Sequence, residues 1–427
     1  MSPILWTPRD GNPSTLGRRT FLRGAGAGML GLAGAALIGC SDDGEEATAT
    51  ATAAATGTVA AGDPSATPAA LEKTEVRVGY LPITDSTPLV LAHGLNYYQE
   101  AGLTAPDPTL FRGWAQIAEA FQARQLDVVH LLMPMAIWLK FGQNVPLRLV
   151  AWNHTGGSAL TVAPSVNAVS DLSGKTVAIP FWYSIHNVVL QMLLREAGLK
   201  VLTQGEPSAQ NSEVKLVVMA PPDMPTALAN GAIAGYIVAD PFNAVAEVNN
   251  VGKILRFIPD VWFEHACCVA IMHEDDVTER PNYTQAVVNS LARAQVYARE
   301  NRAEAARILS GDGNNYLPQP RPVIERALTH YDVGEYGPSG AIKHADWNTE
   351  RIDFQPFPYG SYTEELVRQL KNTVVEGDNS FLQNLDPAEA HRLLVEDKYA
   401  RAAIDHAGGA AKFEVDASLQ RTERIGV

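Results

Sequence analysis

The sequence predicts an α/β protein built from two doubly wound lobes. A strand, a loop and a helix follow one another repeatedly along the chain, which indicates mostly parallel sheets. The part expected to fold covers about 350 residues, more than one hydrophobic core usually serves. Of all 427 residues, 46% are hydrophobic and 19% are charged, a balance typical of a globular protein.

The net charge of −14, from 33 basic and 47 acidic side chains, excludes one class of partner. Proteins that bind nucleic acid neutralise phosphates with Lys and Arg, so an acidic chain has the wrong sign. We therefore expect no nucleic-acid partner. Net charge describes the whole molecule and not a cleft, so a small bound anion is still compatible with this composition.

The first 40 residues have the pattern of an export signal. Arg18 and Arg19 precede a weakly apolar run of 16 residues, 24–39, and Cys40 follows directly. A membrane-spanning helix needs about 20 apolar residues, so this run is too short to span. The pattern resembles a twin-arginine signal that closes on a lipobox. The resemblance implies that residues 1–39 are a signal peptide, that Cys40 is lipidated, and that the chain is tethered at the outer face of the cytoplasmic membrane.

Residues 40–73 are expected to form a disordered tether. Of the 30 residues from 44 to 73, 17 are Ala or Thr, and such a segment buries too little apolar surface to offset its ordering entropy. Lipid on Cys40 leaves only Cys267 and Cys268 as free thiols. The sequence therefore predicts no disulfide framework.

The first lobe is expected over residues 74–160. Alternating apolar residues at 75–81 predict a strand, and the polar turn at 84–88 opens a helix. Residues 128–132 predict another strand, before a helix near Ile137.

The second lobe is expected over residues 161–270, where the same unit occurs three times. The predicted strands are 175–179, 215–219 and 236–239, and the helices predicted after them are 188–197, 225–229 and 242–248. Crossing strands near 158–164 and 266–272 are expected to join the lobes. Ligands bind outside the carboxyl ends of the strands in such sheets, so we expect a ligand cleft between the lobes.

Residues 271–427 are expected to return to the first lobe and to form a helical C-terminal part. Beyond Pro281 the apolar spacing is helical, at 286–309, 323–328, 364–375 and 388–395.

Four segments, in their order along the chain, resemble one known family. They are VGYLP at 78–82, DLSGKTVAIP at 171–180, GYIVADPFN at 235–243 and FPYGS at 357–361. They are similar to the type II periplasmic solute-binding proteins of the nitrate, sulfonate and taurine group, over residues 75–405. The resemblance implies a type II periplasmic-binding-protein fold. It also implies a monomeric protein, not an enzyme, that delivers a small solute to the permease and the ATPase of an ABC importer.

The loop after the predicted strand 175–179 carries the most informative ligand pattern. Ser184 is a good N-cap for the helix that follows, and the free N–H groups of the first turn suit an anion. The resemblance places Ser184, His186 and Asn187 at ligand-facing positions. The alternative is a structural cap, with His186 packed on its own helix.

The same resemblance assigns further ligand-facing positions in both lobes. They are Trp114, His130, Trp152, His154, Asp240 and Asn243. Each has a structural alternative, either as a tryptophan or histidine of the core or as a cap of the helix that begins at Pro241.

Residues 261–268 depart from the family pattern. Nitrate-binding members have a lysine here, whereas this chain has Phe263, Glu264 and Cys267. A carboxylate near the cleft disfavours a bare monovalent anion unless a cation or an ammonium group also binds. Glu264 joins the candidate ligand-binding residues, because it could neutralise such an ammonium group. Three solutes stay open: an amino-sulfonate zwitterion, a bicarbonate-like anion with a co-bound cation, and a flat pyrimidine-like molecule. Apart from that cation, no cofactor is expected.

Two other functions stay open. Cys267, Cys268 and the histidines His130, His265 and His273 are compatible with a metal-dependent enzyme similar to the pyrimidine-precursor synthases, which share this fold. Adjacent cysteines do not have the spacing of a zinc motif, and no G-x-S-x-G or H-E-x-x-H motif occurs. We therefore predict neither metal ligands nor catalytic residues. A ligand-sensing module without transport is the second alternative.

Overall fold

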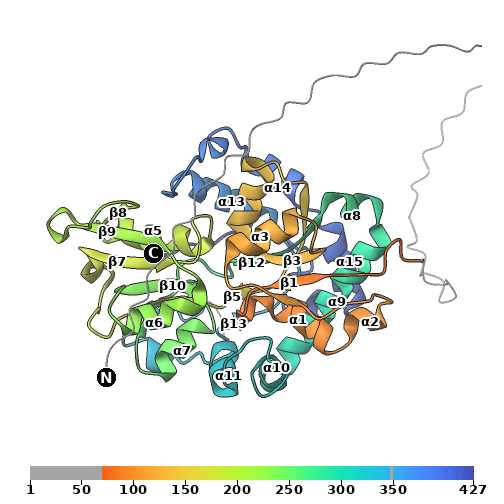
Figure 1. The fold of residues 1–427 in the computed structure, drawn as a ribbon, viewed down its shortest axis with the longest axis horizontal. Coiled ribbons are helices and arrows are strands. Elements are labelled where there is room, and N and C mark those ends of the chain that lie inside the picture. Colours follow the sequence, from red (N-terminus) through yellow and green to blue (C-terminus); the bar gives the residue numbers. More distant parts are fainter. Residues whose placement is uncertain (1–69, 347–349) are drawn as a thin grey trace, which may run out of the picture. The chain divides into compact units, whose positions relative to one another are not determined.

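The computed structural model describes residues 70–346 and 350–427 (Figure 1). These residues belong to one compact unit, Thr67–Val427. The expected signal peptide with Arg18 and Arg19, the expected lipidation site Cys40 and most of the expected tether lie outside the described residues. Within the described ranges, no helix is both long enough and apolar enough to cross a membrane.

The first sheet has five strands in the order β2-β1-β3-β12-β4. Their bounds are β1 (Val78–Tyr80), β2 (Thr109–Leu110), β3 (Val128–Leu132), β4 (Leu147–Trp152) and β12 (Cys268–His273). The segments from β1 to β4 also carry the helices α1 (Thr87–Gly94), α2 (Tyr97–Glu100), α3 (Trp114–Gln122) and α4 (Met133–Ile137). We call this sheet with its helices the first lobe.

The second sheet has six strands in the order β11-β6-β10-β7-β9-β8. Their bounds are β6 (Ser158–Val162), β7 (Lys175–Ile179), β8 (Lys200–Leu202), β9 (Glu213–Val218), β10 (Gly235–Ala239) and β11 (Lys253–Phe257). The helices between them are α5 (Ile185–Glu196), α6 (Met224–Ala229) and α7 (Phe242–Val248). We call this sheet with its helices the second lobe.

One strand in each sheet runs against the others. In the first sheet β12 is antiparallel to β3 and β4, and in the second sheet β6 is antiparallel to β10 and β11. Each is the first strand that the chain adds to its own sheet after leaving the other sheet. The amino end of such a strand therefore lies at the same edge as the carboxyl ends of its neighbours, the edge where ligands bind in doubly wound sheets.

The chain after β12 is helical and packs mainly on the first lobe. Its helices are α8 (Glu274–Glu279), α9 (Pro281–Glu300), α10 (Arg302–Leu309), α11 (Arg321–Thr329), α12 (Val333–Tyr336), α13 (Gly360–Lys371), α14 (Pro387–Leu394) and α15 (Lys398–His406). Helices α1 and α15 contact α9, and α14 and α15 contact β4. A short strand, β13 (Ile352–Asp353), pairs with β5 (Thr155–Gly156) where the chain leaves the first sheet.

The predicted fold class is confirmed: the protein is α/β, with two doubly wound lobes and a helical C-terminal part. The strands β3 and β7 and the helix α7 have the predicted bounds. One expectation needs correction, because the single helix predicted at 286–309 is two helices, α9 and α10. The backbone of Asn301 leaves the helical region between them, at φ −133° and ψ 45°. Asparagine favours helix ends because its side chain competes for backbone hydrogen bonds.

Candidate ligand site between the lobes

The strand ends of the two lobes contact each other directly. The N–H of Thr84, in the 3₁₀ turn Thr84–Ser86 after β1, donates to the carbonyl oxygen of Asp240 after β10, at 2.8 Å. The Thr84 hydroxyl donates to the same oxygen at 3.1 Å. Loops at the carboxyl ends of both sheets therefore face each other, as expected for a site between two doubly wound lobes.

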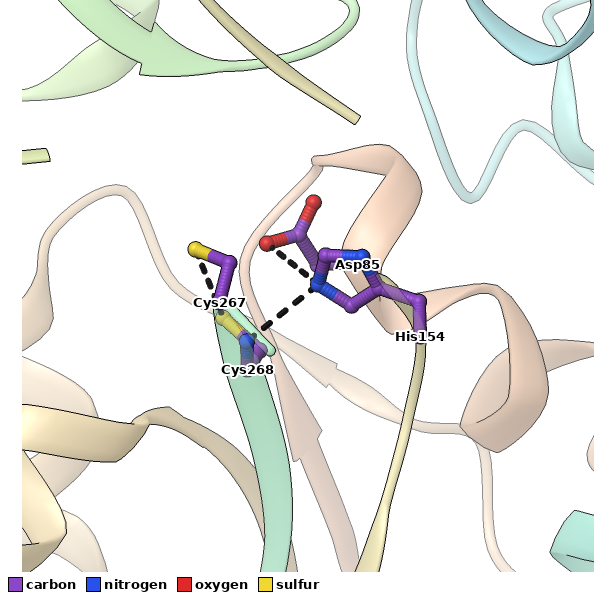
Figure 2. Close-up of side chains that lie close together, drawn as sticks. All are labelled: Asp85, His154, Cys267 and Cys268. Carbon is purple, nitrogen blue, oxygen red and sulfur yellow. Dashed lines mark hydrogen bonds and ion pairs between the residues drawn. The ribbon is translucent and has the colours of Figure 1, made fainter. Parts of the chain in front are cut away.

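Four ligand-type side chains meet at this edge, and we call them the interlobe cluster. They are Asp85, His154, Cys267 and Cys268, all fully buried. One carboxylate oxygen, one imidazole nitrogen and the two sulfur atoms all lie within 4.8 Å of one another. Figure 2 shows the four side chains pointing toward one common region from three separate segments of the chain.

The local sequence explains how these side chains reach one point. Asp85 lies in the turn between β1 and α1, and Pro88 in the first turn of α1 fixes where the helix begins. His154 follows β4 by two residues. Cys268 opens β12 opposite Leu132, the last residue of β3. Cys267 lies just outside the strand, so the alternation of side chains along β12 does not force the two thiols apart.

The contacts within the interlobe cluster are close. His154 Nε2 lies 2.9 Å from Asp85 Oδ2, and the N–H of Cys268 donates to the same nitrogen at 3.2 Å. The two sulfur atoms are 3.9 Å apart, and both cysteines are free thiols.

The electrostatics of the cluster favour the charged forms of Asp85, His154 and Cys267 in spite of burial, but not that of Cys268. Burial opposes ionisation of Asp85, but His154 outweighs it and lowers the pKa of Asp85 to about 2. Burial likewise opposes the charged form of His154, yet Asp85 raises its pKa to about 9. Burial disfavours a thiolate at Cys267, but the hydrogen bond with Cys268 and the nearby His186 lower its pKa to about 6. The pKa of Cys268 is raised by burial and by its bond with Cys267.

The second lobe contributes His186 and Ser158 to the same site. His186 Nε2 lies 3.8 Å from the sulfur of Cys267 and 3.1 Å from the hydroxyl oxygen of Ser158. His186 belongs to the first turn of α5, and Ser158 opens β6. Because β6 is the reversed strand of its sheet, its first residue lies at the edge that faces the first lobe.

Several buried polar atoms next to the interlobe cluster have no hydrogen-bond partner in the described part of the chain. They are Thr87 Oγ1, both atoms of the Asn153 amide, His186 Nδ1 and His265 Nε2. Native interiors satisfy the large majority of such groups, so a group of unsatisfied atoms in one place needs an explanation. A bound ligand between the lobes is such an explanation.

The ten predicted ligand-binding residues divide into those at the site and those elsewhere. His154 and His186 belong to the site. Ser184 accepts from the Asn187 N–H and donates to the Phe181 carbonyl, so its hydroxyl serves the cap of α5. The Asn187 amide donates to the carbonyls of Trp182 and Val374, and so links α5 to the C-terminal part.

The aromatic candidates of the first lobe are core residues. Trp114 is buried against His130, with the ring centroids 5.4 Å apart. His130 accepts from the N–H of Leu81 at 2.8 Å, and burial lowers its pKa to about 3, so it is neutral. Trp152 is fully buried and packs edge-on against Tyr362.

The remaining candidates bind groups of the chain itself. Asp240 forms a buried ion pair with Arg351, at 2.7 Å. The Asn243 amide donates to the carbonyl of Val238 and accepts from the hydroxyl of Thr161. Glu264 lies 3.4 Å from Arg421, with nearly half of its side chain exposed.

Three members of the cluster, Asp85, Cys267 and Cys268, were not among the predicted ligand-binding residues. The sequence analysis placed Asp85 in a polar turn before a helix, and it treated Cys267 and Cys268 as a vicinal pair without the spacing of a metal motif. The position of Asp85, directly after the first strand of a doubly wound sheet, is the signal that could have found it.

Two lobes whose strand ends enclose a polar site between them define the periplasmic-binding-protein fold. The chain belongs to the NMT1-like family, whose model matches residues 69–310. The nitrate/nitrite binding protein NrtA of Nostoc sp. is 24% identical over 341 residues, 74% of this chain and 75% of that protein. The nitrate import ATP-binding protein NrtC of Synechocystis sp. is 28% identical over 280 residues, 62% of this chain; the match spans 41% of that longer protein.

Solved structures have the same fold. The periplasmic nitrate-binding protein NrtA from Synechocystis superposes with a TM-score of 0.68 at 17% identity, covering 82% of this chain and 93% of that chain. The ligand binding component of an ABC-type import system from Staphylococcus aureus, solved with zinc bound, gives a TM-score of 0.60 at 21% identity. The match covers 78% of this chain and 99% of that one. The predicted resemblance to this group of binding proteins is thus confirmed.

Proposed function

We propose that this chain is the extracytoplasmic solute-binding component of an ABC importer. The observation that carries the proposal is the meeting of buried polar side chains from both lobes, where His186 of the second lobe faces Cys267 at the edge of the first. Membership of the NMT1-like family and the similarity to nitrate-binding proteins support the same role.

The proposed mechanism is capture by closure of the lobes. His154 and Cys267 are 0% exposed and His186 is 1% exposed, so a solute enters only when the lobes separate. A solute favours closure only through contacts that it makes in the closed arrangement and not in the open one. His186 and Ser158 supply such contacts from the second lobe. No bond is made or broken in this cycle.

The proposed partners are a membrane permease and its ATPase, which receive the solute from the closed protein. The similarity to an ATP-binding protein of nitrate import supports an ATPase partner. The sequence pattern at Arg18, Arg19 and Cys40 supports export by the twin-arginine route, and lipid at Cys40 would tether a monomer to the outer face of the cytoplasmic membrane.

The three solute classes considered from the sequence all belong in the test, and nitrate joins them. The argument against a bare monovalent anion rested on Glu264, which lies beside Arg421 and half exposed. Because Arg421 lies beside it, the Glu264 carboxylate gives no reason to leave nitrate out of the solute panel.

The test is thermal unfolding of the full chain with one solute at a time. The panel is nitrate, bicarbonate with and without calcium, taurine, an aliphatic sulfonate and an aminopyrimidine, with sodium chloride at equal ionic strength as the control. A true ligand at about 100 times its Kd stabilises the folded protein by about 2.7 kcal/mol, which raises the Tm measurably. We expect one class to do so. A flat response to all of them would contradict capture of these solutes.

A further inference from the structure

We infer that the interlobe cluster is a metal site that binds one thiophilic divalent cation of the zinc type through Asp85, His154, Cys267 and Cys268. The inference deepens the proposed function, because the ion lies in the same site between the lobes. The adjacent cysteines lack the spacing of a zinc motif. The structure completes the ligand set with side chains from two other segments of the chain.

The spacing of the donor atoms fits one ion. Two thiolates on a tetrahedral zinc ion lie about 3.8 Å apart, because each Zn–S bond is about 2.3 Å long. The sulfur atoms of Cys267 and Cys268 are 3.9 Å apart. Nitrogen and oxygen ligands with bonds of about 2.0 Å lie about 3.3 Å apart on the same ion. His154 Nε2 and Asp85 Oδ2, at 2.9 Å, need to separate by only a few tenths of an ångström.

The hydrogen bonds of His154 also favour an ion. The Cys268 N–H donates to Nε2 and therefore requires a lone pair there, whereas the Asp85 carboxylate beside the same nitrogen requires a proton. One protonation state of the ring cannot meet both demands. A cation bound to both Nε2 and Oδ2 removes the need for that proton, and because it takes the only lone pair of Nε2, the Cys268 N–H gives up this acceptor when the ion binds.

The donor set selects the kind of ion. Two thiolates are soft ligands and an imidazole is a borderline one, and with the carboxylate they make four, the number that suits tetrahedral coordination. This set favours zinc over magnesium or calcium, which prefer oxygen ligands alone. The four side chains are fully buried, so the ion would be held away from water.

The second lobe links ion binding to closure. His186 Nε2 lies 3.8 Å from the Cys267 sulfur, and a metal-bound thiolate is a better hydrogen-bond acceptor than a thiol. Loading the ion therefore strengthens a contact that exists only when the lobes are closed.

The test uses the full chain with Cys40→Ser, in which Cys267 and Cys268 are the only thiols. The protein is stripped of metal, reduced, and titrated with zinc against a chromophoric chelator. We expect one zinc ion per chain. Titration with cobalt, which reports its ligands by colour, should give an intense visible spectrum of a tetrahedral site and a thiolate-to-metal charge-transfer band.

Variants assign the ligands. Cys267→Ser combined with Cys268→Ser should lose the charge-transfer band and weaken zinc binding by about 100-fold or more, since substitutions that merely support a ligand already cost 10–100-fold. Asp85→Asn keeps the shape of the side chain and should weaken zinc binding while keeping the band. His391→Gln, a partly buried histidine bonded to Thr363, is the matched control and should bind normally.

Two results would overturn the inference: no stoichiometric uptake of zinc by the reduced chain, or equal affinity in the double serine variant. If that variant fails to fold, judged by circular dichroism, the cobalt spectrum of the unsubstituted chain and of Asp85→Asn still decides. The solute panel is independent of these results. If the chain does not bind zinc but is stabilised by a sulfonate, the metal site is refuted and the proposed function stands.

Discussion

Two buried polar clusters lie at strand ends of this protein, and they are built in opposite ways. In the interlobe cluster, His154 Nε2 is shared between Asp85 and the Cys268 N–H, and neighbouring polar atoms have no partner in the described part of the chain. In the second cluster, Arg351 donates to Asp240 through Nε and Nη2 and to Glu247 through Nη1, at 2.7 to 3.2 Å. We call Arg351, Asp240, Glu247 and Arg326 the arginine cluster.

The difference shows what distinguishes a structural cluster from a ligand site. Glu247 also accepts from Arg326 and from the Tyr336 hydroxyl, so the arginine cluster satisfies its charges with groups of the chain itself. Burial of charge is common to both clusters. The two clusters differ in their hydrogen bonds: within the described residues, several buried polar atoms beside the interlobe cluster have no partner, whereas no buried polar atom of the arginine cluster lacks one. This difference is what points to a ligand at the interlobe cluster.

The largest expected effect comes from Arg351→Met in the arginine cluster. The substitution leaves the carboxylates of Asp240 and Glu247 buried without their main partner, which should lower the free energy of unfolding by about 3–5 kcal/mol. Urea unfolding measures it. Arg112→Met, which breaks an exposed pair with Asp223, is the control and should cost at most about 1 kcal/mol. A loss below about 1 kcal/mol for Arg351→Met would mean that the arginine cluster is not the structural one.

The arginine cluster should also make stability depend on acid. Burial acts to raise the pKa of Glu247, but Arg351 and the hydrogen bonds from Arg326 and Tyr336 outweigh it and hold the pKa at about 2, below the usual 4.5. A carboxyl group with a lowered pKa stabilises the folded state fully above its unfolded pKa and loses this contribution as the pH falls through the folded pKa.

Glu247 should therefore contribute up to about 3 kcal/mol at neutral pH, and this contribution should fall as the pH drops from about 4.5 toward 2. Urea unfolding at about pH 5 and about pH 3 compares the unsubstituted chain with Glu247→Gln. The variant should be less stable at the higher pH, and its deficit should shrink at the lower one. An equal deficit at both values would show that the charge of Glu247 does not stabilise the fold.

His186→Ala tests the interlobe side of the comparison. The side chain is the contact of the second lobe with Cys267, so its loss should weaken binding of whichever solute stabilises the protein by at least about 10-fold, or about 1.4 kcal/mol. Isothermal titration measures the affinity. His391→Ala, in the C-terminal part, should bind as the unsubstituted chain does. Unchanged affinity in His186→Ala would show that the His186 side chain does not contact the solute.

The fold was predictable because its signals are local. The recurring order of a short apolar segment, a loop and a helix predicted β3 at 128–132 and β7 at 175–179 with their observed bounds. The break between α9 and α10 was missed, since a single asparagine does not interrupt the helical spacing of apolar residues around it.

The site was only partly predictable, because its members come from distant parts of the chain. The family resemblance pointed to His154 and His186, but Asp85 and Cys268 become neighbours only when β12 returns to the first sheet. The same limit applies to charges: Asp240 reads as a candidate ligand-binding residue until Arg351, far along the chain, is seen to neutralise it.

Ser184→Ala should have the smallest effect, and it separates the two roles that the sequence left open for this residue. Its hydroxyl accepts from the Asn187 N–H and donates to the Phe181 carbonyl, so its loss removes the cap of α5 at a cost of about 1 kcal/mol in unfolding free energy. Affinity should stay within about twofold of the unsubstituted chain, a change of about 0.4 kcal/mol. If affinity falls tenfold instead, Ser184 contacts the solute in the closed protein, and the cap is part of the ligand site as well as of the helix.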